Sequence, residues 1–166
     1  MNLFLLRHGL AVEPDTPGFK NDAVCPLTPK GRRQLGKVAQ AMRRMELSFD
    51  VIWSSPLVRA RQTAELVAKA LPARPLALAD DLSPGGNAGK LIKKLQALKP
   101  APENILLVGH EPDLSELLSR LVTGNTHAGF AFKKAGLAKL EVDSLRAAKC
   151  ATLAWLLTPG QMKAMV

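Results

Sequence analysis

Two histidines in this chain each follow a short apolar run, and together they have the chemistry to act on a phosphoryl group. Residues 3–6 are followed directly by Arg7 and His8, and residues 105–108 are followed, after one glycine, by His110. A guanidinium group and two imidazoles can bind an anion, and an unprotonated imidazole can attack phosphorus. Either chemistry requires the fold to bring these distant groups together.

Both apolar runs predict buried strands that end beside the histidines. A continuous apolar run of this length is typical of a strand covered on both faces. Ligands of open α/β sheets lie outside the carboxyl ends of the strands, so His8 and His110 are expected at the same edge. A single histidine at a strand end is most often a hydrogen-bonded structural residue. The pair, beside Arg7, favours a functional site instead.

A fourth group is expected at this edge from the segment that follows residue 50. Residues 50–55 predict a short strand that ends in Ser54 and Ser55, and a helix follows from residue 57. Arg59 falls in the first turn of that helix, where the helix dipole disfavours a cation. This position favours an arginine that faces an anionic ligand, with a solvent-exposed arginine as the simpler alternative.

The set Arg7, His8, Arg59 and His110, with Ser55 beside it, suits a doubly charged phosphate. Planar guanidinium groups bind phosphate oxygens in pairs, and four donors can hold the charge that spreads during phosphoryl transfer. His8 is the better-placed nucleophile, and His110 would donate a hydrogen bond to a non-bridging oxygen. Zinc is a weaker alternative, because catalytic sites use three protein ligands and two cations would oppose the metal. We therefore expect no metal and no cofactor.

Residues 6–9 (LRHG) resemble the signature of the histidine phosphatase superfamily, which includes phosphoglycerate mutases and acid phosphatases. Similar family motifs follow in the family's order at residues 27–31 (LTPKG), 55–64 (SPLVRARQTA) and 108–110 (VGH). The resemblance covers essentially the whole chain, and its short length and its ending resemble the SixA-type protein phosphohistidine phosphatases. It implies a phosphoglycerate mutase-like fold and His8 as the phospho-accepting nucleophile. It also implies a phosphate pocket made by Arg7, Arg59 and His110.

The proton donor of the superfamily is not evident in its expected place. Mutases and many small-molecule phosphatases of the superfamily carry an acidic residue in the loop after the third strand. This chain offers Asp80 and Asp81 there, without the family's glutamate pattern. An alkoxide leaves poorly without a proton, whereas the imidazole of a phosphohistidine is a much better leaving group. This difference from the family pattern favours phosphohistidine as the substrate. Asp81 is either the possible general acid or a residue with only a structural role in a turn.

These features predict a protein phosphohistidine phosphatase, a hydrolase that acts on a phosphorylated partner such as a histidine phosphotransfer domain through a phospho-His8 intermediate. With 166 residues, the chain has no room for the substrate-binding insertions of the mutases, so the pocket is expected to be open to a folded partner. The first alternative is a broad-specificity small-molecule phosphomonoesterase of the same superfamily. A more distant alternative is a non-catalytic module that binds anions or nucleic acid.

The charge of the chain favours an anionic partner. The formal net charge is +9, which would attract acidic proteins. Aromatic residues make up only 4% and tyrosine is absent, so stacking platforms for nucleic acid are scarce and no nucleic-acid partner is expected. A positive rim would favour an acidic partner, and its candidates are Arg32, Arg33, Arg61, Lys90 and Lys93.

The cysteines and the hydropathy of the chain predict a cytoplasmic protein with no membrane partner, and a monomer is expected. Cys25 and Cys150 lack metal-binding spacing, and free thiols in a reducing compartment explain them most simply. The chain enters its first strand without a basic leader, and no apolar stretch is long enough to span a membrane.

Alternating strands and helices predict a single domain over residues 1–166, with a three-layer α/β/α architecture and a mainly parallel sheet that has an antiparallel edge. Thr28 is expected to cap a helix over residues 29–45, and Asn87 a helix over residues 88–98. The long loop of residues 10–27 carries charged side chains, including Asp22, that could border the site. The other expected elements are a helix over residues 57–71, a weak strand over residues 74–79, a loop over residues 80–87, a helix after residue 112 that stops near residue 124, strands over residues 135–142 and 150–157, and a short helix after residue 158.

Overall fold

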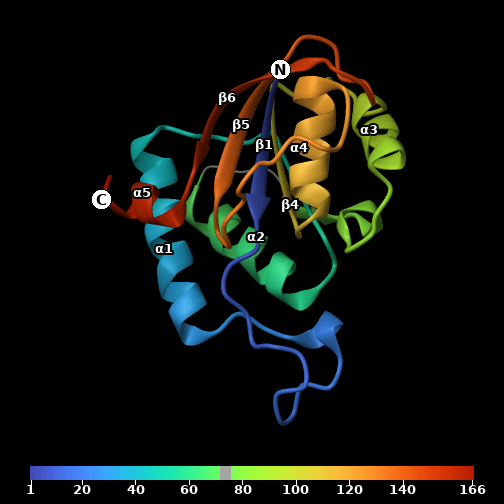
Figure 1. Cartoon of the computed structure of the whole chain (residues 1–166). Helices are drawn as coiled ribbons and strands as arrows, with labels where there is room; N and C mark the ends of the chain where they lie inside the picture. Colours follow the sequence, from blue (N-terminus) through green and yellow to red (C-terminus); the bar gives the residue numbers. More distant parts are fainter. Residues whose placement is uncertain (72–75) are drawn as a thin grey trace.

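The computed structural model describes residues 1–71 and 76–166, and in this part of the chain a six-stranded mixed sheet carries helices on both faces (Figure 1). The strand order is β3-β2-β4-β1-β5-β6. The first four strands of this order run parallel, and β5 runs antiparallel to both β1 and β6. The predicted fold class is confirmed. The strands are β1 (Asn2–Arg7), β2 (Val51–Ser54), β3 (Leu76–Leu78), β4 (Asn104–Gly109), β5 (Leu137–Val142) and β6 (Ala151–Leu157).

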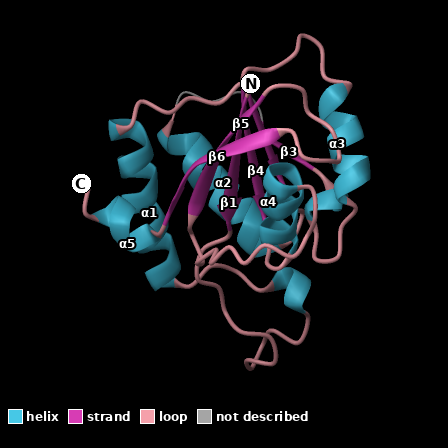
Figure 2. Cartoon of the chain, turned by 45° about the horizontal axis from the view of Figure 1, so that its top comes forward, coloured by secondary structure: helices cyan, strands magenta, loops and turns pink. Residues whose placement is uncertain are grey.

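Two layers of helices explain why the central strands are apolar on both faces. In β1, Leu3 and Leu5 contribute to the core under α3 and α4, whereas Phe4 and Leu6 contribute to the core under α1, α2 and α5. Figure 2 shows these two groups of helices on opposite sides of the sheet. The helices are α1 (Pro29–Arg44), α2 (Val58–Ala70), α3 (Ala88–Gln96), α4 (Asp113–Thr123) and α5 (Pro159–Lys163).

The two predicted helix caps are present. The Thr28 hydroxyl accepts a hydrogen bond from the Gly31 amide at 3.0 Å, and the Asn87 side chain accepts one from the Lys90 amide at 2.9 Å. Gly31 also allows α1 to approach the preceding loop, because a Cβ atom at this position would collide with the Leu10 carbonyl oxygen. This approach fixes the start of α1 against the segment that leaves β1.

Two segments predicted as loops contain single turns of 3-10 helix, η1 (Asp22–Val24) and η2 (Asp80–Leu82). Three-residue helices have no periodic pattern in a sequence, so the prediction did not detect them. The weak strand predicted over residues 74–79 is confirmed only as the three residues of β3, and residues 74 and 75 lie outside the described part.

The ends of two other elements also differ from the prediction. The helix that Asn87 caps stops at Gln96 instead of residue 98. Strand β5 begins at Leu137 instead of residue 135, because Ala135 adopts a positive φ of 61° and belongs to a turn. Cys25 and Cys150 are both free and buried. None of the helices in the described ranges is long and apolar enough to cross a membrane.

Candidate active site

The pairing of β1 with β4 brings the two histidines side by side. The strands are parallel neighbours, and Arg7 is aligned with Gly109, so His8 and His110 leave the sheet together at its carboxyl edge. The His8 amide donates to the Gly109 carbonyl at 3.1 Å. The two ring centroids are 5.0 Å apart. Residues separated by about a hundred positions in the sequence therefore share one site.

The imidazole of His8 is oriented by its own backbone. Its Nδ1 lies 2.8 Å from the Gly9 carbonyl oxygen, and this oxygen can only accept, so Nδ1 carries the proton and Nε2 the lone pair. Nε2 accepts a hydrogen bond from Nε of Arg59 at 3.3 Å. Burial, helped by the charges of the neighbouring cations, lowers the pKa of His8 to about 3. At neutral pH the ring is an unprotonated base with its lone pair on Nε2.

His110 is held by the serine that ends β2. Its Nε2 lies 2.9 Å from the Ser55 hydroxyl, and this hydroxyl also accepts from the Leu57 amide at 3.3 Å. The Ser55 hydroxyl can donate its proton to Nε2, and in that tautomer the proton of neutral His110 is on Nδ1. Burial, followed by the charge of Arg59, lowers the pKa of His110 to about 4. Nδ1 is buried and has no partner among the described residues.

Arg59 is fixed by a residue that the sequence analysis placed only in a bordering loop. Its Nη1 donates to the Asp22 backbone carbonyl at 2.7 Å, and its Nη2 donates to the Asp22 carboxylate at 2.8 Å. The arginine is only 8% exposed. A hollow of about 220 Å³ opens beside His8, with Asp22, Arg59 and Lys134 among its lining residues. Asp22 therefore aims Arg59 along the wall of this hollow.

One nitrogen of the Arg7 guanidinium group is hydrogen-bonded, and another has no partner among the described residues. Its Nη1 donates to the Phe132 carbonyl at 2.7 Å, whereas its buried Nε has no partner among the described residues. Burial lowers the pKa of Arg7, and the nearby Glu111 carboxylate acts in the opposite direction. The guanidinium group remains charged and offers a donor to an anion at this edge.

Thr63 links the segment after β1 to helix α2. Its buried hydroxyl accepts from the Gly9 amide at 3.1 Å and donates to the Arg59 carbonyl at 2.7 Å. This threonine lies in the family motif of residues 55–64, and the sequence alone indicates no role for it. Its two hydrogen bonds connect the backbone beside His8 to the backbone of Arg59.

Comparison with known proteins identifies the family. The model of the histidine phosphatase superfamily (branch 1) matches residues 3–84. An uncharacterized protein of Picosynechococcus is 37% identical over 147 residues, which are 88% of this chain and 88% of that protein. The chain belongs to the histidine phosphatase superfamily.

This histidine phosphatase resembles SixA proteins over nearly its whole length. It is 27% identical over 165 residues to the phosphohistidine phosphatase SixA of Escherichia coli, covering 98% of this chain and 97% of that protein. The structure of the protein histidine phosphatase SixA complexed with tungstate has a TM-score of 0.82 at 26% identity and covers 96% of this chain and 98% of that one. The α-ribazole phosphatase of Shigella flexneri shares the fold, with a TM-score of 0.75 at 22% identity over 96% of this chain and 97% of that one. The protein is therefore a hydrolase of a phosphatase family, with a SixA-like structure.

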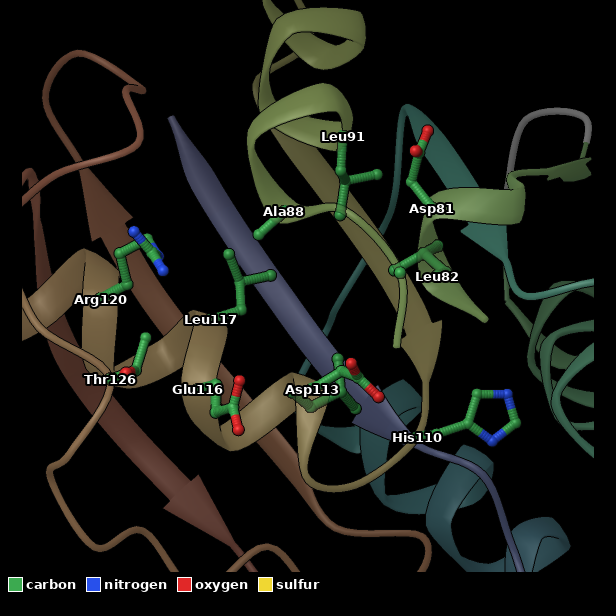
Figure 3. Close-up of a pocket in the computed structure, with 12 residues that line it drawn as sticks. Asp81, Leu82, Ala88, Leu91, His110, Asp113, Glu116, Leu117, Arg120 and Thr126 are labelled. Carbon is green, nitrogen blue, oxygen red and sulfur yellow. The ribbon is translucent and has the colours of Figure 1, made fainter. Parts of the chain in front are cut away.

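The structure does not bring the carboxylate of Asp81 to the histidines. Asp81 and His110 line the same small cavity of about 50 Å³, but the Asp81 carboxylate points away from His110 (Figure 3). It forms an ion pair with Lys94 of α3. Of the predicted site residues, Arg7, His8, Ser55, Arg59 and His110 are brought together, and Asp81 is directed elsewhere.

The described residues also form no metal-ligand cluster at this edge. Over residues 1–71 and 76–166, no group of three histidine, cysteine or carboxylate side chains is arranged to hold a metal ion. The neighbours of the two imidazoles are arginines and a serine, which are donors to an anion.

The lowered pKa values predict that the protein loses stability in mild acid. His8 and His110 have pKa values of about 3 and about 4 when folded, against 6.5 for a free imidazole. Between these values the unfolded chain binds more protons than the folded one, so the free energy of unfolding falls as pH drops from 6.5 toward 4. We expect each histidine to contribute a loss on the order of 2 kcal/mol at pH 4.5. Urea unfolding at pH 7 and pH 4.5 measures the total.

Single variants distinguish the contribution of the two histidines to the pH dependence of stability from that of the other titrating groups. His8→Asn should lose less stability on acidification than the wild type, whereas His127→Asn, at an exposed position, should behave like the wild type. An unchanged pH dependence in both His8→Asn and His110→Asn would contradict the assignment.

Proposed function

We propose that this histidine phosphatase is a protein phosphohistidine phosphatase that works through a phospho-His8 intermediate. The observation that carries the proposal is the unprotonated Nε2 of His8, held within hydrogen-bonding distance of Arg59 and beside His110. A nucleophile, two guanidinium groups and a neutral imidazole donor are what transfer of a dianionic phosphoryl group requires. The similarity to SixA supports this substrate class.

The first step transfers the phosphoryl group to the enzyme. The Nε2 lone pair of His8 attacks phosphorus while the bond from phosphorus to the imidazole nitrogen of the substrate breaks. The electron pair of that bond stays on the substrate nitrogen, and the ring leaves as neutral imidazole because its other nitrogen carries a proton. Nδ1 of His8 keeps its proton and donates it in a hydrogen bond to the Gly9 carbonyl. This hydrogen bond stabilises the positive charge that develops on the ring. Arg59 moves its Nε donor from His8 to a phosphoryl oxygen, and the free Nε of Arg7 and Nδ1 of His110 bind others.

The second step returns the enzyme to its starting state. A water molecule enters through the open hollow beside His8 and attacks phosphorus. The bond between phosphorus and Nε2 breaks, its electron pair returns to the imidazole, and the proton released by water leaves with phosphate and solvent. Histidine and phosphate are the products, and no cofactor takes part in either step.

The carboxylates near the site favour a leaving group that needs little acid assistance. Asp81 is paired with Lys94, and Asp22 is bound by Arg59. Both carboxylate oxygens of Glu111 accept hydrogen bonds from Ser115, one from its amide and one from its hydroxyl. An alkyl phosphate depends on a proton donor for its alkoxide, and general acid catalysis contributes about 10²–10⁴-fold to such steps. A phosphohistidine releases imidazole, which is a far weaker base.

The test compares the two leaving groups on one enzyme preparation. We expect kcat/KM for phosphohistidine, presented on a panel of phosphorylated histidine phosphotransfer domains, to exceed that for phosphoserine by at least about 10²-fold. Release of inorganic phosphate measures both reactions. Equal or faster hydrolysis of phosphoserine would instead support a broad small-molecule phosphomonoesterase.

A further inference from the structure

The turn before β5 is bound to the backbone of Arg7 and His8. The Ala135 amide donates to the carbonyls of Arg7 and His8 at 3.1 and 3.0 Å, and the Arg7 amide donates to the Gly136 carbonyl at 3.1 Å. Nη1 of Arg7 reaches back to the Phe132 carbonyl. In Figure 1 this segment meets the end of β1 at the carboxyl edge of the sheet. Lys133 and Lys134 lie within this turn, so the backbone fixes their place relative to the nucleophile.

Both lysines line a hollow next to the phosphate pocket. This hollow of about 550 Å³ is bordered by Arg7, Gln34, Lys133 and Lys134, together with the start of α5. Lys134 also lines the hollow beside His8 and Arg59, so it joins the two. A group that enters along Lys134 would lie close to a phosphoryl group on His8.

The charges in this hollow are positive and only partly balanced. Lys134 contacts the Glu13 carboxylate at 3.4 Å, and Glu13 itself is largely exposed on the loop after β1. Among the described residues, no carboxylate lies within ion-pairing distance of Lys133. Glu13 shows that a carboxylate can reach Lys134 from the solvent side. A second carboxylate, supplied from outside, would complete the charge balance.

We propose that Lys133 and Lys134 form a carboxylate subsite that binds an acidic side chain of the phosphorylated partner, next to its phosphohistidine. The inference rests on the proposed function and adds a determinant of substrate choice to it. The partner is a protein because the hollow is open and lies beside the phosphate pocket. A protein can present a second side chain there from the same surface that carries its phosphohistidine. On a helix, a glutamate four residues after the phosphohistidine lies on the same face, with about 6 Å between the two Cβ atoms.

The test uses a pair of helical peptides, each phosphorylated on one histidine, with glutamate or glutamine four residues after it. The measured quantity is the ratio of kcat/KM for the glutamate peptide to that for the glutamine peptide. We expect a ratio of about five for the wild type, falling to about one in the double variant Lys133→Gln/Lys134→Gln. Glu13→Gln, which removes the competing carboxylate, should raise the ratio.

A charge-matched variant separates a local subsite from the general positive field. Lys69→Gln/Lys149→Gln removes the same charge at the opposite edge of the sheet, where α2 and α4 end, and it should keep the wild-type ratio. An equal fall in this control would overturn the proposal. So would a wild-type ratio of one, or a ratio that survives loss of Lys133 and Lys134.

Two further outcomes separate this subsite from the proposed function. If the wild type hydrolyses neither peptide, the proposed function fails. If the lysines affect only the preference for phosphoserine over phosphoethanolamine, the carboxylate subsite serves a small molecule, and the protein partner is overturned.

Discussion

The variant His8→Ala is expected to lose at least about 10³-fold in kcat/KM toward phosphohistidine, because it removes the atom that accepts the phosphoryl group. The neighbouring donors stay in place and can still bind phosphate, so substrate binding should fall much less than turnover. Phosphate release from a phosphorylated histidine phosphotransfer domain measures the rate. Competition by inorganic phosphate measures the pocket that remains.

A covalent intermediate gives a second, independent readout of the same prediction. Brief reaction at low temperature followed by an alkaline quench should leave acid-labile phosphate on the wild-type chain and none on His8→Ala. The matched control is His127→Ala, which removes an exposed imidazole and should keep full activity and labelling. A His8→Ala protein that retains wild-type turnover, or that still becomes phosphorylated, would exclude His8 as the nucleophile.

The meeting of His8 and His110 at one edge could be predicted, because it depends only on the direction of the strands in the sheet. Residues 3–6 and 105–108 are apolar on both faces, which predicts central parallel strands, and parallel strands present their carboxyl ends at one edge. His8 and His110 follow these strands directly, so no loop conformation had to be known. Arg59 follows β2 in the same way, at the start of α2.

The contacts that orient these groups could not be predicted, because they come from loops. Asp22 reaches Arg59 only through the path of residues 10–27, and a loop of this length has no periodicity from which its course can be read. The direction of Asp81 depends on Lys94 in another element. The turn at Lys133 and Lys134 depends on Ala135 in a left-handed conformation, which a non-glycine residue rarely adopts.

In the proposed mechanism, the same cations have two effects on His8. Arg7 and Arg59 attract the phosphoryl group, and their charges also help to keep the pKa of His8 low. A protonated imidazole would bind phosphate equally well but could not attack it. Lysine and histidine cations do not offer the paired donors of a guanidinium group. A site that used them alone would lack the bidentate donors that hold the anion while the nucleophile stays unbound and free to attack. Binding and activation are therefore linked through the arginines.

Removal of Arg59 is expected to have the second-largest effect on catalysis. Its Nε contacts the atom proposed to attack, and its two Nη groups are held by Asp22 in the wall of the hollow beside His8. Arg59→Ala should reduce kcat/KM by about 10²–10³-fold, through both a higher KM and a lower kcat, since charge on the phosphoryl oxygens is stabilised in the bound substrate and in the transition state. Initial rates over a range of substrate concentrations separate the two parameters.

Conservative variants test whether Arg59 supports activity through the bidentate geometry of its guanidinium group or only through its charge. Arg59→Lys keeps the charge but loses the Nε donor and the bidentate geometry, so it should recover less than a tenth of the wild-type activity. Asp22→Asn keeps the backbone contact and removes the ion pair, so its activity should lie between Arg59→Lys and the wild type. The matched control is Arg43→Ala, which removes an exposed arginine from the last turn of α1. If Arg59→Lys were fully active, the guanidinium geometry would be irrelevant, and a general positive charge would be sufficient for phosphoryl transfer.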